Sequence, residues 1–167
     1  MATFTNDQEK RLAELKKEVT KRGFDQHASV LKNISELPSE LQSPAVTALA
    51  AREAVQMIVA FPPQIHRGWY YIPKQALLFT SGDMVHLLGS IWPDQEPQVT
   101  CLKGCGLMYM KVTLLLLYGF LEVVAQGQSL PARVGMEFNT VAWHHLSHSW
   151  RQVLHATKAA PRIPVDQ

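Results

Sequence analysis

The sequence lacks the features of several functional classes, and it contains only two cysteines, Cys101 and Cys105. One CxxxC pair cannot supply the four ligands of a structural zinc site. Its spacing also differs from the CxxC of redox proteins. We therefore expect two free thiols and a reducing compartment, the cytoplasm.

Neither sign of charge is in excess, because 16 basic residues stand against 14 acidic ones and the net charge is +2. Proteins that bind nucleic acid usually carry a long basic run or a basic face, and the sequence has no such run. Trp69 beside Arg67 has the composition of a base-stacking surface, but strand aromatics more often pack within a sheet. We expect no nucleic-acid partner.

No stretch has the length and apolar character of a transmembrane helix. The uncharged segment from Val112 to Leu121 spans ten residues, whereas a bilayer requires about 20. The first 25 residues are polar and charged, so we expect no signal peptide.

Catalytic motifs are also lacking, since the sequence contains no GxGxxG, GxxxxGK or GxSxG. Ser81, Asp83 and His86 are the residue types of a triad, but they alternate along one hairpin and are not expected to meet. Tertiary contacts can still assemble a site from distant residues, for which the best candidates are His66, His86, Asp83 and Glu137. We expect no catalytic residue, no metal and no cofactor.

Four histidines cluster in WHHLSHSWRQVLH. On a helix, His144, His148 and His155 share one face, and an i, i+4 pair can chelate Zn²⁺. No nearby Asp, Glu or Cys completes a site, so a solvated helix face is the favoured interpretation. A metal-binding or enzymatic protein that uses His144, His148 and His155 stays as an alternative.

The first 63 residues carry helical patterns. Thr5 followed by Gln8 forms a capping box, and Gly23 ends the helix that this box begins. Its apolar face consists of Leu12, Leu15 and Val19. This stripe is narrow and its charges are mixed, so packing on the domain or on a second copy is favoured over a membrane surface.

Two further helices are predicted before residue 63. A short one runs from Ala28 to Leu37. Another begins at the cap Ser43 with Pro44 in its first turn, where a missing N–H costs nothing. Its apolar face extends through Met57 and Ile58, and the prolines of FPP end it.

The pattern changes after Pro63, because only seven residues between Gly68 and Ala125 are charged. Turn residues divide this region into short apolar segments typical of antiparallel strands. The predicted strands are Trp69–Ile72, Gln75–Thr80, Met84–Gly89, Gln98–Leu102, Leu107–Thr113, Leu115–Ala125 and Ala132–Phe138. Asn139 caps a final amphipathic helix from Thr140 to Thr157, and residues 159–167 form a tail.

This order of elements resembles the bacterial pleckstrin-homology-like domains. The resemblance rests on GWYYIPKQALLFTSGDMVHL as an opening hairpin, LLLLYGFLEVV as a late strand, and VGMEFNTVAWHHLSHSWRQVL as the last strand and helix. It implies an α+β protein in which an antiparallel β-barrel of about seven strands is closed by a C-terminal helix. The expected divisions are a helical region at 1–63, the barrel with its closing helix at 64–158, and the tail.

Lipid-binding members of that family carry a basic cluster on the first hairpin. Here the hairpin offers only Lys74, with Arg67 just before it, so we expect weak or absent membrane contact. We predict a non-enzymatic binding or scaffolding module that mediates protein–protein interaction, with another protein or a second copy as partner. The residues expected to contact this partner are Arg67, Trp69, Tyr71 and Lys74. Peripheral membrane or lipid binding is the alternative.

Overall fold

The computed structural model describes residues 4–22, 28–50, 55, 57–66, 70–80, 83–103, 107–116, 118–125 and 132–139. Helix α1 spans Asn6–Arg22, the 3₁₀ helix η1 spans Ile34–Glu36, and helix α2 spans Ser39–Leu49. The described strands are β1 (Ser29–Leu31), β2 (Met57–Phe61), β3 (Gln64–His66), β4 (Tyr70–Ile72), β5 (Gln75–Phe79), β6 (Asp83–Leu88), β7 (Gln98–Lys103), β8 (Leu107–Leu114), β9 (Tyr118–Ala125) and β10 (Ala132–Asn139).

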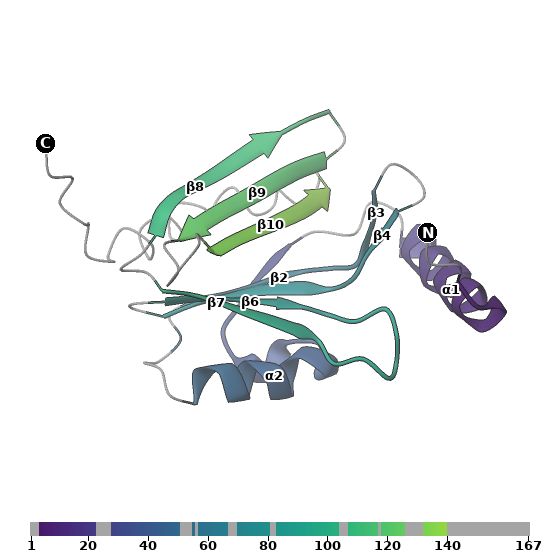
Figure 1. Cartoon of the computed structure of the whole chain (residues 1–167), viewed down its shortest axis with the longest axis horizontal. Coiled ribbons are helices and arrows are strands. Elements are labelled where there is room, and N and C mark those ends of the chain that lie inside the picture. The colour runs from purple at the N-terminus through teal and green to yellow at the C-terminus, as the bar shows by residue number, and fades with distance from the viewer. Residues whose placement is uncertain are drawn as a thin grey trace, which may run out of the picture.

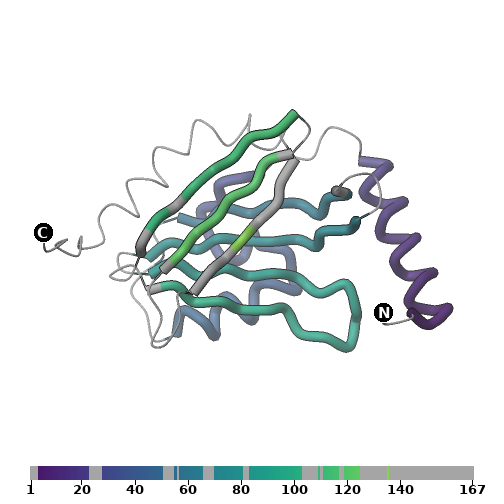
Figure 2. The backbone as a smooth tube through the Cα atoms, turned by 45° about the horizontal axis from the view of Figure 1, so that its top comes forward, coloured from purple at the N-terminus to yellow at the C-terminus, as the bar shows by residue number. Residues whose placement is uncertain are grey.

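The described strands form three antiparallel sheets. The largest has the order β1-β2-β5-β6-β7, the second has the order β10-β9-β8, and β3 pairs with β4. Helix α2 covers one face of the five-stranded sheet, and the three-stranded sheet lies over the opposite face (Figure 1). Figure 2 shows the strands of the two larger sheets crossing. Helix α1 lies at the end of the five-stranded sheet where Figure 1 labels β3 and β4.

The main core lies between α2 and the five-stranded sheet. Its buried members come from the residue that follows η1, from α2 and from the three strands β2, β5 and β6: Leu37, Leu41, Ala45, Ile58, Ala76, Leu78, Val85 and Leu87. Every residue of β5 is buried, because this central strand is covered on both faces. That double coverage explains why the sequence of β5 shows little alternation between apolar and polar residues.

The capping box predicted at the first helix is confirmed. The Thr5 N–H donates to Gln8 Oε1 at 3.0 Å, and the Gln8 N–H donates to Thr5 Oγ1 at 3.4 Å. Val19, on the predicted apolar face, is the buried residue of α1. Local hydrogen bonds and one apolar stripe therefore suffice to specify this helix.

The predicted strands are confirmed as β4 to β10, with small shifts at their ends. The largest shift is in β9, which begins at Tyr118 rather than Leu115. The hairpin of β5 and β6 is closed by Thr80, whose N–H donates to the Asp83 carbonyl at 2.9 Å. Turn chemistry and alternation therefore located this part of the fold correctly.

The prediction of a helix from Ala28 to Leu37 is wrong. Ser29–Leu31 is instead strand β1, which pairs with β2 so that Leu31 lies opposite Ile58. A single 3₁₀ turn follows, and Asn33 donates its backbone N–H to Glu36 Oε1 at 3.1 Å. Asparagine competes for helix hydrogen bonds through its side chain, and pairing with β2 satisfies the backbone of β1.

The prediction of a helix from Ser43 through Ile58 is also wrong at both ends. Helix α2 begins at Ser39 and contains Pro44 in its interior, and Met57–Phe61 is strand β2. Leu41 and Ala45 are both 0% exposed, and their burial offsets the hydrogen bond that proline removes. The β-branched pair Ile58 and Val59 favours a strand.

The α+β class is confirmed, but the described strands form separate sheets rather than a closed barrel. β1 and β2 precede residue 63 and yet pair with β5 or with each other, so one sheet runs across the predicted boundary there. The predicted helix from Thr140 to Thr157, the histidines on it and the tail 159–167 lie outside the described residues.

Candidate functional site

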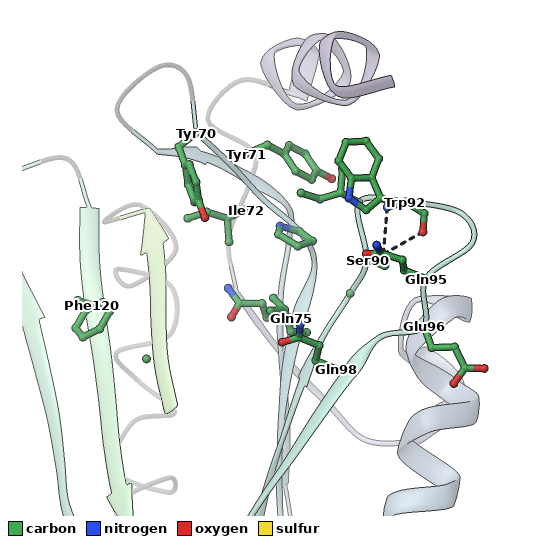
Figure 3. Close-up of a pocket in the computed structure, with 15 residues that line it drawn as sticks. Tyr70, Tyr71, Ile72, Gln75, Ser90, Trp92, Gln95, Glu96, Gln98 and Phe120 are labelled. Atoms are coloured by element: carbon green, nitrogen blue, oxygen red, sulfur yellow. Dashed lines mark hydrogen bonds between the residues drawn. The ribbon is translucent and has the colours of Figure 1, made fainter. Parts of the chain in front are cut away.

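A cavity of about 390 Å³ lies where the five-stranded sheet meets the β6–β7 loop and the three-stranded sheet. Figure 3 shows aromatic and amide side chains gathered around it. Its described lining consists of Tyr70, Tyr71, Ile72, Pro73, Gln75, Leu88, Gly89, Ser90, Ile91, Trp92, Gln95, Glu96, Gln98, Phe120 and Gly135. Glu96 is the charged member of this set. The lining is therefore aromatic and polar, with little charge.

The first wall is the β4–β5 segment. Tyr70 is 55% exposed, whereas its neighbour Tyr71 is 8% exposed, because successive residues of a strand point to opposite faces. Burial raises the pKa of the Tyr71 hydroxyl, and the nearby Glu40 and Glu18 carboxylates raise it further. Tyr71 therefore keeps its proton and presents an O–H donor at neutral pH.

The second wall is the loop that joins β6 to β7. The Ser90 hydroxyl donates to the Trp92 carbonyl at 3.0 Å and accepts the Trp92 N–H at 3.1 Å. The Trp92 ring contacts the Phe4 ring, with centroids 5.8 Å apart. These contacts orient Trp92 from both sides, so that it stands beneath α1 next to Tyr71 (Figure 3).

The third wall comes from the three-stranded sheet. Gly135 of β10 lies opposite Glu122 of β9, and the ring of Phe120 lies across Gly135. A Cβ at residue 135 would stand 2.8 Å from Phe120 Cζ. The absence of a side chain at residue 135 therefore lets the Phe120 ring extend over β10 toward the cavity.

A buried pair supports the floor. His86 Nε2 lies 3.1 Å from Gln75 Oε1, and both side chains are buried. Because a carboxamide oxygen only accepts, His86 donates through Nε2–H, and the Gln75 amide keeps its two N–H donors. Burial lowers the pKa of His86 to about 4, so the ring is neutral near pH 7.

A second buried amide lies close to this region. Gln64 is 6% exposed, and its Nε2 has no hydrogen-bond partner among the described residues. Gln64 pairs with Ile72 across the β3–β4 ladder, so the two side chains share a face of that ladder. Ile72 lines the cavity, which places an unsatisfied donor on the same side.

Two of the four residues predicted to contact a partner belong to the described part of the chain. Tyr71 lines the cavity. Lys74 lies in the two-residue break between β4 and β5, where its Nζ is 3.7 Å from Glu40 Oε2 in a partly exposed ion pair. Arg67 and Trp69 lie outside the described residues.

The catalytic candidates do not converge where the structure describes them. Asp83 and His86 are three residues apart in β6, so their side chains point to opposite faces of the sheet. His66 and Glu137 lie in β3 and β10, and their side chains are not described. Among the described residues, no three His, Cys, Asp or Glu side chains gather as a metal-binding group. Cys101 is a free, exposed thiol.

Sequence reasoning missed Gln75, Trp92 and Phe120. The position of Gln75 could have identified it, because it begins the apolar run QALLF, which is buried in the structure. A polar side chain in a buried strand usually has a specific hydrogen-bond partner. Trp92 stands just before a polar loop that starts at Pro93. No local pattern predicts that these residues meet Phe120, which is 28 positions farther along the chain than Trp92.

Replacement of Gly89 by alanine is expected to reduce stability by about 1–3 kcal/mol. The Gly89 N–H donates to the Lys74 carbonyl at 2.8 Å, and a Cβ at residue 89 would stand 3.0 Å from that same oxygen. The Cβ would also stand 2.9 Å from Glu40 Oε1; that carboxylate can rotate away, whereas the Lys74 carbonyl is backbone and cannot. Urea denaturation measures the loss.

Gly135→Ala is the matched control, because its added Cβ would meet the edge of the Phe120 ring rather than backbone. A ring can turn aside, so this variant should lose less than about 1 kcal/mol. Equal losses for Gly89→Ala and Gly135→Ala would contradict the close contact between Gly89 and the backbone of Lys74.

No helix among the described residues combines the length and apolar character needed to cross a membrane. Comparison of the chain with protein-family models finds no match, and comparison with curated protein sequences finds none.

Proposed function

We propose that this protein is a non-enzymatic binding module that recognises a partner protein through the cavity beside β4 and the β6–β7 loop. The observation that carries the proposal is the concentration of aromatic side chains there, namely Tyr70, Tyr71, Trp92 and Phe120. Tyrosine and tryptophan dominate the binding energy of protein interfaces. The volume of about 390 Å³ suits one inserted side chain and its neighbouring backbone.

We also propose that the fold is pleckstrin-homology-like. Strands β2, β5, β6 and β7 are neighbours in that order, and β8, β9 and β10 form a second meander. A four-stranded meander followed by a three-stranded one supports this proposal, as does the amphipathic sequence that follows Asn139. An experimental structure with one helix over residues 140–157 against the two sheets would establish it.

Tyr70→Ser is expected to weaken partner binding at least about tenfold, since truncation of an interface hot spot costs roughly 2 kcal/mol. Tyr70 is 55% exposed, so the substitution should leave stability almost unchanged. Capture from the native cell extract, with wild type and variant side by side, identifies the partner. Titration calorimetry with that partner then measures the loss.

Tyr109→Ser is the matched control for Tyr70→Ser. Tyr109 is a strand tyrosine of similar exposure, at 43%, and it lies in β8 outside the cavity lining. It should retain full binding. A partner that is lost with Tyr109→Ser and kept with Tyr70→Ser would move the interface to the three-stranded sheet. Light scattering shows whether the partner is a second copy of this chain.

Peripheral membrane binding is the second candidate, and one observation favours it. Leu114, Leu115 and Leu116 lie at the end of β8, and their exposed fractions are 47%, 47% and 92%. Exposed apolar side chains at the end of a hairpin can enter a lipid surface. The nearest candidate for headgroup contact on the first hairpin, Lys74, is already paired with Glu40.

We expect only weak sedimentation with phosphatidylserine vesicles, because a lysine contributes about 1 kcal/mol near an anionic surface. Neither Lys74→Ala nor Leu116→Ser should change this low level. Strong binding that Leu116→Ser abolishes would favour the membrane. Strong binding that salt and Lys74→Ala abolish would favour headgroup recognition.

A further inference from the structure

We propose that the cavity receives a neutral side chain that ends in a carboxamide, such as glutamine or acetylated lysine, from the partner protein. This inference rests on the proposed function and names the group that the site selects. It comes from three properties of the described lining, which are its low charge, the buried amide of Gln75 and its aromatic walls.

Low charge excludes an anionic end group. Glu96 is the charged residue among the described lining residues, and Figure 3 shows its carboxylate directed away from Gln75 and Trp92. Lys74 is held by Glu40 at 3.7 Å and is not part of the lining. A carboxylate in the cavity would lose part of its hydration without gaining a cation from the described lining.

The low charge also argues against a cationic end group. The carboxylate of Glu96 is exposed, so it stabilises a cation little more than water does. A buried ammonium or guanidinium group would therefore find no desolvated partner among the described lining residues. The remaining class is an uncharged group that forms hydrogen bonds.

Amide donors favour an acceptor at the tip of that group. His86 holds the oxygen of Gln75 at 3.1 Å, so the Gln75 amide offers N–H rather than C=O. Gln64 carries a second buried Nε2 that lacks a partner among the described residues, on the face of the β3–β4 ladder that carries Ile72, but Gln64 does not itself line the cavity. A carboxamide supplies the carbonyl acceptor that such a donor needs.

Aromatic walls suit the apolar stem of such a side chain. Tyr71 and Trp92 stand together at one end of the cavity, Ile72 lies beside Tyr70, and Phe120 comes from the opposite sheet (Figure 3). A flat carboxamide and a methylene stem can lie against these rings without leaving a polar group unpaired. The site therefore combines apolar contact along the stem with hydrogen bonds at the end.

The test uses tripeptides of the form acetyl-Gly-X-Gly-amide added to the full-length, isotopically labelled protein. Glutamine, glutamate and methionine at X have nearly the same shape, and acetyl-lysine is compared with lysine. We expect glutamine and acetyl-lysine to shift the amide resonances of Tyr70, Gln75 and Trp92. The glutamate, methionine and lysine peptides should bind at least about tenfold more weakly, because a buried donor would be left unpaired or a charge desolvated.

Gln75→Met tests the assigned donor, with Gln98→Met as the matched control. Gln75→Met should abolish the preference for glutamine over methionine, whereas Gln98→Met should keep it. Thermal denaturation checks that each variant folds. Should Gln75→Met fail to fold, the comparison of peptides on the wild-type protein decides alone.

Equal binding of glutamate or methionine would overturn the carboxamide assignment, and so would the absence of any shift at the cavity. Neither result affects the proposed function, which depends on the loss of the partner with Tyr70→Ser. If Tyr70→Ser keeps the partner while the glutamine peptide still shifts the cavity resonances, the pocket binds carboxamides but is not the partner interface.

Discussion

Replacement of Leu41 by alanine is expected to lower the free energy of unfolding by about 2–5 kcal/mol. Leu41 is 0% exposed and lies on α2 against the five-stranded sheet, in the cluster that includes Leu78 and Val85. Truncation removes buried methyl groups and leaves a cavity that the surrounding sheet cannot fill. Urea denaturation followed by circular dichroism measures the change.

Val46→Ala provides the control within the same helix. Val46 is 57% exposed, so its truncation should change stability by no more than about 0.5 kcal/mol. Alanine is also the better helix former, which offsets part of any loss. Similar costs at Leu41 and Val46 would show that α2 does not pack on the sheet as described.

Acidification is expected to destabilise the protein through His86, by about 3 kcal/mol between pH 6.5 and pH 4. Burial lowers the pKa of His86 from 6.5 to about 4. Between these values the unfolded chain binds a proton that the folded protein does not, so the free energy of unfolding falls as the pH falls. Well above pH 6.5, where the unfolded histidine has also lost its proton, both states are neutral at this residue and its contribution is constant.

His86→Gln isolates this effect, because glutamine does not titrate and can still donate to Gln75. Denaturation midpoints at half-unit steps from pH 7.5 to pH 4 compare the two proteins. The wild type should lose stability faster than the variant over this range, although acidic groups titrate in both. Parallel profiles would mean that His86 is accessible to water in the folded protein.

Local signals in the sequence determined much of the fold. The capping box of Thr5 and Gln8 predicts α1, and its two hydrogen bonds are present. Turn residues and apolar runs after Pro63 predict strands β4 to β10. These elements were predictable because the interactions that specify them lie within a few residues of one another.

Tertiary pairing decided the elements for which local signals conflict. Ser29–Leu31 and Met57–Phe61 contain apolar residues at spacings that also fit a helix. They become strands because each pairs in register with a neighbour, β1 with β2 and β2 with β5. Short apolar runs have no decisive period, so the partner strand settles their structure.

The cavity depended on tertiary structure almost entirely. Tyr71 was singled out from the sequence as a contact residue, but Gln75, Trp92 and Phe120 were not. Phe120 reaches the cavity because Gly135, on another strand, leaves room for its ring. The Gln75 amide is oriented by His86, 11 positions away in the chain. The sequence shows that aromatic and amide residues are present, but only the packing of separate strands brings these side chains together at one site.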